Sequence, residues 1–225
     1  MKQMENTVAL AIFDLDNTLI NGDSDHGWGE FLVEQGLVDK QYYQDKNDYY
    51  LQQYQLGQLD IHEYLEFSLQ ALTQFTQEEL SKLHNTFMQD KILPLISNKS
   101  RQLIAKHREQ GDYLLIITAT NLFVTEPIAK ELAMDDIIAT EPEVINGQYT
   151  GKVAGIPSFQ DGKVKRLTTW LEKTGLSLQG SYFYSDSRND LPLLELVDHP
   201  VVVDADDTLL AHAKQHDWPI ISLRD

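Results

Sequence analysis

The fold is decided by an apolar run and the polar loop that follows it, Val8-Ala9-Leu10-Ala11-Ile12-Phe13-Asp14-Leu15-Asp16-Asn17-Thr18-Leu19. A short apolar run of this length is typical of a buried β-strand. Because the run ends directly at Asp14, the strand delivers a polar loop at its carboxyl end. We therefore expect a central strand over residues 8–13, followed at once by the two carboxylates Asp14 and Asp16.

Further apolar runs of strand length recur along the chain, and helical patterns separate them. Repeated alternation of strand and helix predicts an α/β fold, a Rossmann-like parallel sheet with helices on both faces. In such sheets the active site lies beyond the carboxyl ends of the strands. Asn146-Gly147 between strand-like flanks predicts a two-residue hairpin. The strand-like runs are 113–117, 181–184, 201–203 and 219–223, and the helical patterns are 99–110, 125–133, 163–174 and 191–196.

Residues 21–95 break this alternation, because they are helix-patterned and poor in strands. Gly36, Gly57 and the capping signal Thr76-Gln77-Glu78-Glu79 punctuate the segment. We interpret residues 21–95 as a helical cap domain inserted into a core of residues 1–20 and 96–225. The cap carries 13 acidic residues and four lysines, a formal charge of −9, and no arginine precedes Arg101.

Composition limits the partners and the metal. The chain has 35 Asp and Glu against 18 Lys and Arg, a net charge of −17, which repels nucleic acid and anionic bilayers. It has no cysteine, so a metal must be held by oxygen or imidazole, which favours Mg²⁺ over Zn²⁺. No basic leader and no long apolar segment is present, so we expect a cytoplasmic protein without a membrane partner. The oligomeric state stays open.

Two elements at predicted strand ends suit phosphate chemistry. Asp14 and Asp16 repel each other unless a cation or a reaction offsets the repulsion. A magnesium ion and a phosphoryl group do so, because one carboxylate can attack phosphorus while the other protonates the leaving oxygen and later activates water. Thr118, followed by Ala119, supplies a hydroxyl and successive backbone amides for a phosphate.

Two further elements complete the pattern. Lys163 opens a predicted helix and can neutralise phosphate charge; Lys152 and Lys165 are the alternatives, less favoured because they do not open that helix. The segment Ser185-Asp186-Ser187-Arg188-Asn189-Asp190 has carboxylates four residues apart that can converge on a hard cation.

In this order, the four elements resemble the haloacid dehalogenase (HAD) superfamily, in its phosphoserine-phosphatase-like branch with a helical cap. The resemblance implies a magnesium-dependent phosphomonoesterase in which Asp14 becomes a phosphoaspartate and Asp16 is the acid/base. It implies phosphate contacts from Thr118, Ala119, Lys163 and Asn189, and magnesium ligands from Asp14, the carbonyl of Asp16 and Asp186, with Asp190 in support. Ser185, where many relatives have glycine, and Arg188 depart from the pattern.

Alternative functions are weighed on single residues. Within the superfamily, Asp16 favours a phosphatase or phosphomutase over dehalogenases and ion-pumping ATPases, which lack this aspartate. A phosphate-sensing module without turnover is expected to lack Asp14, Asp16, Lys163 or Asp186, and all four are present.

A second copy of the first motif is Val201-Val202-Val203-Asp204-Ala205-Asp206-Asp207-Thr208-Leu209, but only 16 residues follow it, too few for the other motifs. We interpret it as a late strand with a helix N-cap.

The resemblance also bears on the substrate. In phosphoserine phosphatases a carboxylate nine residues after the nucleophile binds the substrate amine, and Asp23 has that position. Ser68 aligns with the cap arginine that binds the substrate carboxylate, which disfavours phosphoserine. We therefore rank histidinol phosphate first, with Asp23, Asp25, Trp28 and His26 as expected contacts. Phosphoserine comes second and phosphatidylglycerophosphate third. The cap tyrosines Tyr42, Tyr43, Tyr49, Tyr50 and Tyr54 are interpreted as a packing face, with the alternative that one of them lines the substrate pocket.

Overall fold

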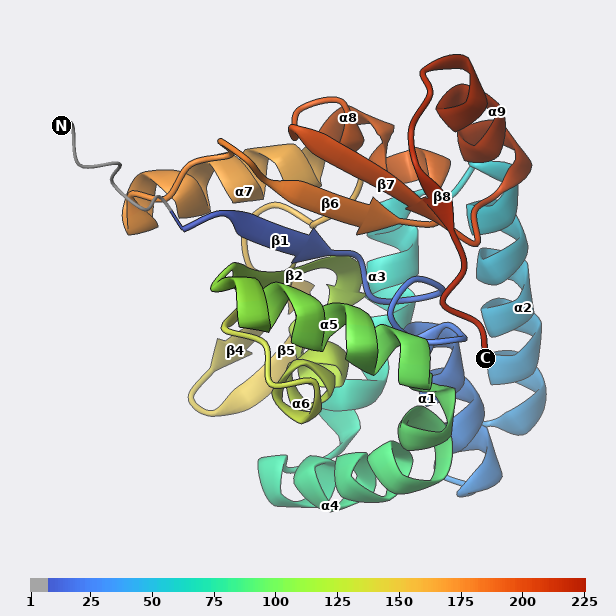
Figure 1. The fold of residues 1–225 in the computed structure, drawn as a ribbon. Helices are drawn as coiled ribbons and strands as arrows, with labels where there is room; N and C mark the ends of the chain where they lie inside the picture. Colours follow the sequence, from blue (N-terminus) through green and yellow to red (C-terminus); the bar gives the residue numbers. More distant parts are fainter. Residues whose placement is uncertain (1–7) are drawn as a thin grey trace, which may run out of the picture.

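The computed structural model describes residues 8–225 and places six parallel strands in one sheet, in the order β3-β2-β1-β6-β7-β8 (Figure 1). β1 is central, because Phe13 pairs with Ile116 of β2 on one side and with Tyr184 of β6 on the other. All four residues of β1 are completely buried, as expected for an apolar run between two neighbours. The strands are β1 Leu10–Phe13, β2 Tyr113–Asn121, β3 Asp136–Thr140, β6 Tyr182–Ser185, β7 His199–Val203 and β8 Ile220–Ile221.

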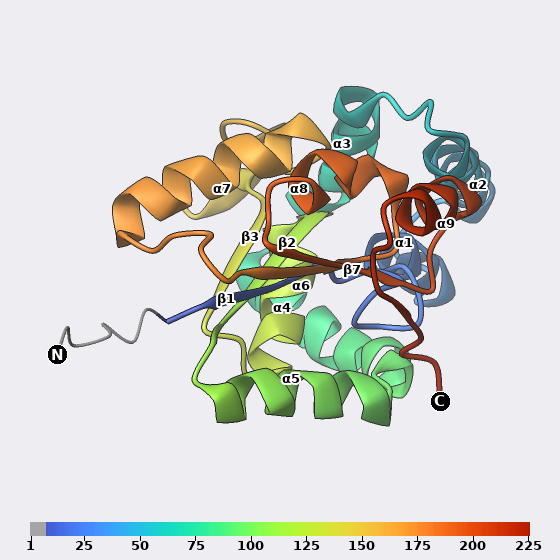
Figure 2. The same ribbon diagram turned by 45° about the horizontal axis from the view of Figure 1, so that its top comes forward.

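Helices cover both faces of this sheet (Figure 2). Side chains alternate along β1, so Phe13 packs on the side of α5 and α6, whereas Ile12 packs on the side of α7, α8 and α9. The predicted α/β class with a parallel, two-sided sheet is confirmed. These helices are α5 Asn98–Gln110, α6 Leu122–Glu131, α7 Asp161–Thr174, α8 Leu191–Leu194 and α9 Asp207–Gln215, with the short helix η4 Arg188–Asp190 before α8.

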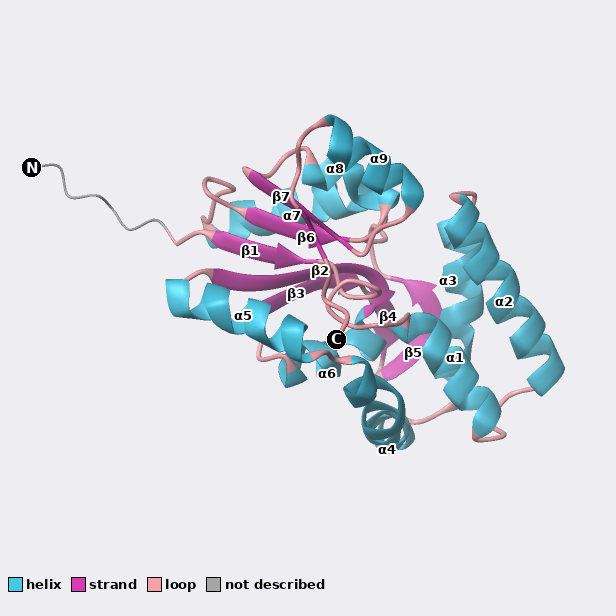
Figure 3. Cartoon of the chain, turned by 45° about the vertical axis from the view of Figure 1, so that its right-hand side comes forward, coloured by secondary structure: helices cyan, strands magenta, loops and turns pink. Residues whose placement is uncertain are grey.

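The segment 21–95 consists of helices joined by short loops, and its helices α1 to α3 lie beyond the carboxyl ends of the strands (Figure 3). Its apolar side chains, such as Phe31 and Phe87, belong to the same buried cluster as Phe13 of the sheet. The capping box at Thr76 and Glu79 is confirmed. The domain limits at residues 20/21 and 95/96 stay a prediction. The helices are α1 Ser24–Glu34, α2 Lys40–Leu56, α3 Ile61–Gln70, η1 Ala71–Gln74, α4 Gln77–Phe87, η2 Met88–Ile92 and η3 Leu93–Leu95.

The structure adds one strand to those expected from the sequence. β3 lies at the edge of the sheet and pairs with β2, and its apolar stretch of Ile137, Ile138 and Ala139 is short. The hairpin at Asn146-Gly147 is confirmed: it joins β4 Pro142–Ile145 and β5 Gln148–Val153, and both turn residues have positive φ. Within residues 8–225, no helix combines the length and apolarity needed to cross a bilayer.

Candidate active site

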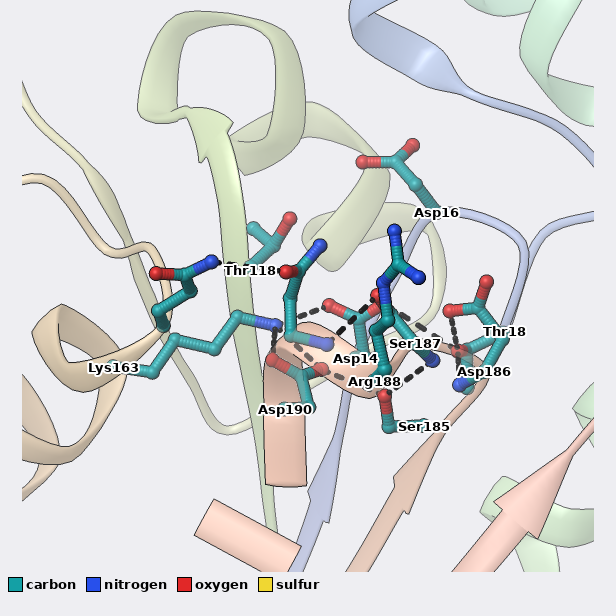
Figure 4. Close-up of polar contacts among 12 residues, drawn as sticks. Asp14, Asp16, Thr18, Thr118, Lys163, Ser185, Asp186, Ser187, Arg188 and Asp190 are labelled. Carbon is teal, nitrogen blue, oxygen red and sulfur yellow. Dashed lines mark hydrogen bonds and ion pairs between the residues drawn. The ribbon is translucent and has the colours of Figure 1, made fainter. Parts of the chain in front are cut away.

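The loop after β1 turns the side chains of Asp14 and Asp16 in different directions. The amide of Asp14 still donates to Tyr184 O at 2.9 Å, so Asp14 keeps the strand geometry. Asn17 then adopts φ 56°, and the carbonyl of Leu15 accepts the amide of Ile20 at 3.1 Å, which closes a tight turn. Figure 4 shows Asp16 apart from the hydrogen-bonded group that surrounds Asp14.

Lys163 lies at the centre of that group. Its Nζ donates to Asp14 Oδ1 and to Asp190 Oδ2, both at 2.8 Å, and its side chain is 5% exposed. α7 begins close enough for this contact because Gly162 precedes Lys163, at a point where a Cβ would lie 2.0 Å from the carbonyl oxygen of Pro157. Lys163 therefore comes to the site, whereas Lys152 and Lys165 are exposed.

Asp190 is held from a second side by Ser185. The Ser185 hydroxyl donates to Asp190 Oδ2 at 2.7 Å and accepts the amide of Ser187 at 3.1 Å. This contact explains the serine at a position where glycine was expected from the resemblance. The loop between β6 and α8 is thereby tied to the same carboxylate that orients Lys163.

Asp186 approaches Asp14 through Thr18. The Thr18 hydroxyl lies 3.0 Å from Asp186 Oδ1 and 3.4 Å from Asp14 Oδ2, so a single hydroxyl separates the two carboxylates. Among residues 8–225, no three Asp, Glu, His or Cys side chains form a metal cluster by themselves. The expected magnesium ligands include only two carboxylates, Asp14 and Asp186, and the third ligand is the backbone carbonyl of Asp16.

Charge at this site is only partly balanced. Burial raises the pKa of Asp14 to about 6, although Lys163 opposes the shift. Burial, followed by the charges of Asp14 and Asp190, raises the pKa of Asp186 well above its usual value. Burial alone would lower the pKa of Lys163, but Asp14 and Asp190 outweigh it, so this pKa lies above normal. Lys163 is the one cation beside three carboxylates, Asp14, Asp186 and Asp190. The remaining negative charge and the hard oxygen donors fit a site for a divalent cation such as Mg²⁺.

Asp16 has a separate environment that suits an acid. Its carboxylate accepts the amide of Ser24 at 2.6 Å and the hydroxyl of Thr120 at 2.8 Å. Burial, followed by the charge of Asp23, raises the pKa of Asp16 to about 8. The two carboxylates of the first motif thus differ in protonation tendency, as is typical of a nucleophile and its acid partner.

One pocket, with about 740 Å³ of empty space including its mouth, joins these groups to the helical segment. Its lining includes the expected phosphate contacts Thr118, Ala119, Lys163 and Asn189, together with Asp14, Asp16 and Asp190. Asp186 contacts this group through Thr18 but does not line the pocket.

The start of α1 carries a second carboxylate pair, Asp23 and Asp25. Asp23 is the N-cap of α1, and its Oδ1 accepts the amides of Asp25 and His26 at 3.0 and 2.9 Å, which fixes the side chain. Asp25 is 7% exposed and accepts Nδ2 of Asn121 at 3.2 Å. Burial, opposed by a hydrogen bond from Tyr64, raises the pKa of Asp25 to about 7. Asp23, Asp25 and His26 all line the pocket.

The expectation that Trp28 contacts substrate is wrong. Trp28 is 3% exposed, stacks on Phe31 and His84, and does not line the pocket. From α1 it also packs edge-on against Phe87 and Phe123, with ring centroids 5.2 Å away in both cases. Its bulk therefore serves the buried aromatic cluster between α1 and α4.

Sequence reasoning favoured packing for the cap tyrosines and did not single out Tyr64. Tyr50 and Tyr54 of α2 and Tyr64 of α3 line the pocket, so these tyrosines do more than pack. The signal was present: pocket residues on α2 recur at helical spacing, at positions 47, 50, 51 and 54. Ser68, one turn after Tyr64, does not line the pocket.

The second copy of the first motif is structural in form, as expected. Asp204 follows β7, and Asp206 caps α9 by accepting the amides of Thr208 and Leu209, both at 2.9 Å. Asp204 accepts the amide of Leu223 at 2.9 Å and does not line the pocket.

Comparison with known proteins identifies the family and the fold. The model of the haloacid dehalogenase-like hydrolase family matches residues 11–195. A histidinol-phosphatase from Neisseria meningitidis serogroup C (strain 8013) is 44% identical over 219 residues, which make up 96% of this chain and 99% of that protein. Phosphoserine phosphatase SerB1 from Mycobacterium tuberculosis (strain ATCC 25618 / H37Rv) is 29% identical, over 96% of this chain and 71% of that protein.

Two solved structures extend the comparison. A protein from Bordetella pertussis Tohama I, described as having unknown function, is 40% identical with a TM-score of 0.92, over 97% of this chain and 100% of that chain. A substrate-bound phosphoserine phosphatase has a TM-score of 0.70 at 18% identity, over 96% and 94%, which shows a common fold. The chain therefore belongs to the haloacid dehalogenase-like hydrolase family. Within that family it is a phosphatase, a hydrolase of phosphoric monoesters.

Proposed function

We propose that the chain is a magnesium-dependent phosphomonoesterase acting through a phosphoaspartate on a small amino-bearing phosphate ester, histidinol phosphate in the first place. The observation that carries the proposal is the charge distribution in the pocket. Lys163 is the one lysine or arginine that lines it among residues 8–225, and it contacts Asp14, whereas Asp23 and Asp25 line the pocket from the start of α1. Such a pocket accepts a molecule with an anionic group near Lys163 and a cationic group near Asp23 and Asp25.

The reaction uses the two carboxylates of the first motif in turn. An Asp14 oxygen attacks phosphorus, and the ester P–O bond breaks as Asp16 gives its proton to the leaving alcohol oxygen. Asp16 then takes a proton from water, whose oxygen attacks phosphorus and releases phosphate from Asp14. Lys163, next to Asp14 at 2.8 Å, stabilises charge on the phosphoryl group. Asp14, Asp186 and the carbonyl of Asp16 would hold Mg²⁺, which would supply further positive charge beside the phosphoryl group.

The cap end of the pocket fits an amine beside a ring. Asp23 is fixed by its N-cap contacts and is the group for the ammonium, while Asp25 offers a second carboxylate oriented by Asn121. Tyr50 and Tyr64 line the same pocket and provide aromatic surface. An imidazole ring with N–H groups matches this combination of acceptors and aromatic rings.

Phosphoserine is the second candidate, favoured by the name of SerB1 and by the shared fold. The absence of arginine from the pocket lining of residues 8–225 counts against it, because bidentate binding of a carboxylate is a task of arginine. The net charge of −17 favours a small-molecule ester over nucleic acid or a lipid surface, and we infer a cytoplasmic reaction.

A substrate panel with an isosteric variant tests the proposal. We expect a higher kcat/KM for histidinol phosphate than for phosphoserine. Asp23→Asn keeps the N-cap acceptor but loses the charge, so it should cost about 1.5–3 kcal/mol with histidinol phosphate, mainly as raised KM. Glycerol phosphate is the control, because it has no amine and should be indifferent. A higher kcat/KM for phosphoserine would contradict the proposal. So would an equal loss of kcat/KM with histidinol phosphate and glycerol phosphate in Asp23→Asn.

A further inference from the structure

Arg188 joins the loop of the fourth motif to the end of a helix in the segment 21–95. It lies between Asp186 and Asn189, and its Nη2 donates to the carbonyl oxygen of Gln55 at 2.9 Å. Gln55 is in the last turn of α2, where backbone carbonyls have no partner inside the helix. A cation at this helix end also interacts favourably with the helix dipole.

The end of α2 is shaped for this contact. Gly57 is the left-handed C-cap of α2, with φ 70°. A Cβ at Gly57 would lie 2.4 Å from Nη2 of Arg188, so the guanidinium occupies the space that the missing side chain leaves. The backbone of Arg188 is itself anchored, because its amide donates to Asp206 Oδ2 at 2.7 Å.

A second, independent contact joins the same two segments. The hydroxyl of Tyr54, on α2, donates to Oγ of Ser187 at 3.2 Å. Tyr54 lines the pocket, and its ring centroid lies 6.4 Å from that of Phe159, which lines the pocket from the loop before α7. The end of α2 is therefore attached to the fourth-motif loop at adjacent residues, next to the pocket.

We propose that Arg188 is a positioning residue that fastens α2 over the pocket and so couples the substrate-facing tyrosines to the loop that carries Asp186, Asn189 and Asp190. α2 presents Tyr50 and Tyr54 to the pocket, and the loop holds Lys163 through Asp190. Fastening one to the other completes the pocket from both sides. Without Arg188, α2 is held over the pocket in a smaller fraction of the molecules. This raises the apparent dissociation constant of any substrate that contacts α2.

Hydrogen exchange measures this coupling without turnover. Arg188→Ala should speed amide exchange in residues 51–57 by about tenfold, the range expected for one hydrogen bond to a charged group, and leave β1 and β2 unchanged. Arg188→Lys keeps the positive charge but lacks the planar guanidinium, so its residues 51–57 should be better protected from exchange than those of Arg188→Ala. Arg166→Ala is the matched control, because Arg166 binds Glu141 and the carbonyl of Ile156 away from α2. Unchanged exchange in residues 51–57, or a uniform rise over the whole chain, would overturn the proposal.

Kinetics give the second test. With a generic aryl phosphate, Arg188→Ala should raise KM by about tenfold with a smaller effect on kcat. Adding Tyr54→Phe to Arg188→Ala should cost less than the sum of the single changes, because both contacts hold the same helix end. A loss confined to kcat, or strict additivity, would contradict the coupling. If no phosphate ester is hydrolysed, the proposed function fails, but the exchange experiment still decides the role of Arg188.

Discussion

The ionised carboxylate of Asp25 is expected to lower the free energy of unfolding at the pH at which it binds the substrate. It is 7% exposed, and the hydrogen bonds from Asn121 and Tyr64 do not replace the water it loses, so burial raises its pKa from 3.8 to about 7. Because the folded-state pKa is the higher one, the folded protein binds the proton more tightly than the unfolded chain. The stability that this proton contributes is complete below the unfolded pKa and is lost as pH rises through about 7.

The size of the effect follows from the shift. A change from 3.8 to about 7 corresponds to at most about 4 kcal/mol of destabilisation above pH 8. Most of this cost accumulates above pH 5. Asp25→Asn removes the ionisation but keeps the shape of the side chain. Relative to the wild-type protein, the variant should therefore gain on the order of 2–3 kcal/mol in unfolding free energy between pH 5 and pH 8.

Urea unfolding at both pH values measures this gain. The matched control is Asp48→Asn on the exposed part of α2, where the carboxylate meets water in both states and no pH-dependent gain is expected. With the substrate panel, Asp25→Asn should lower kcat/KM for histidinol phosphate more than for glycerol phosphate. A stability difference that is the same at pH 5 and pH 8 would refute the assignment of a buried, costly carboxylate at position 25.

Two further predictions concern the nucleophile and the metal. Asp14→Asn should abolish turnover, whereas Asp204→Asn should keep most of it, because Asp204 lies outside the pocket. Steady-state assays of the folded variants measure this difference. The reverse pattern would show that the nucleophile belongs to the second copy of the motif. Activity should vanish in EDTA and return with Mg²⁺, while Ca²⁺ should inhibit because its looser coordination misplaces Asp14. Full activity in the chelator would exclude the metal from the reaction.

The strand pattern was predictable where burial was complete. β1 and the start of β2 have uninterrupted apolar residues because each lies between two neighbouring strands. β3 was missed because its apolar stretch is only three residues long and follows Asp136, whose carboxylate accepts a hydrogen bond from Nε1 of Trp170 at 2.7 Å rather than marking a loop.

The site was predictable where a residue type has one chemical task. Asp14, Lys163 and Asp190 meet as expected because carboxylates and a buried lysine at parallel strand ends have few other uses. Trp28 and Tyr64 could not be sorted in the same way. Both are aromatic residues of the helical segment, and only the rotation of α1 and α3 decides which one packs and which one faces the pocket.

The central claim is that Asp14 carries the phosphoryl group, and trapping of the intermediate tests it most directly. In Asp16→Asn, an aryl phosphate whose leaving group needs no proton should still phosphorylate the enzyme, while activation of water fails. After an acid quench, mass spectrometry should find one phosphoryl group on the peptide that contains Asp14, and none when Asp14→Asn is added. A phosphoryl group on the Asp204 peptide, or turnover without any phosphorylated enzyme, would contradict the account.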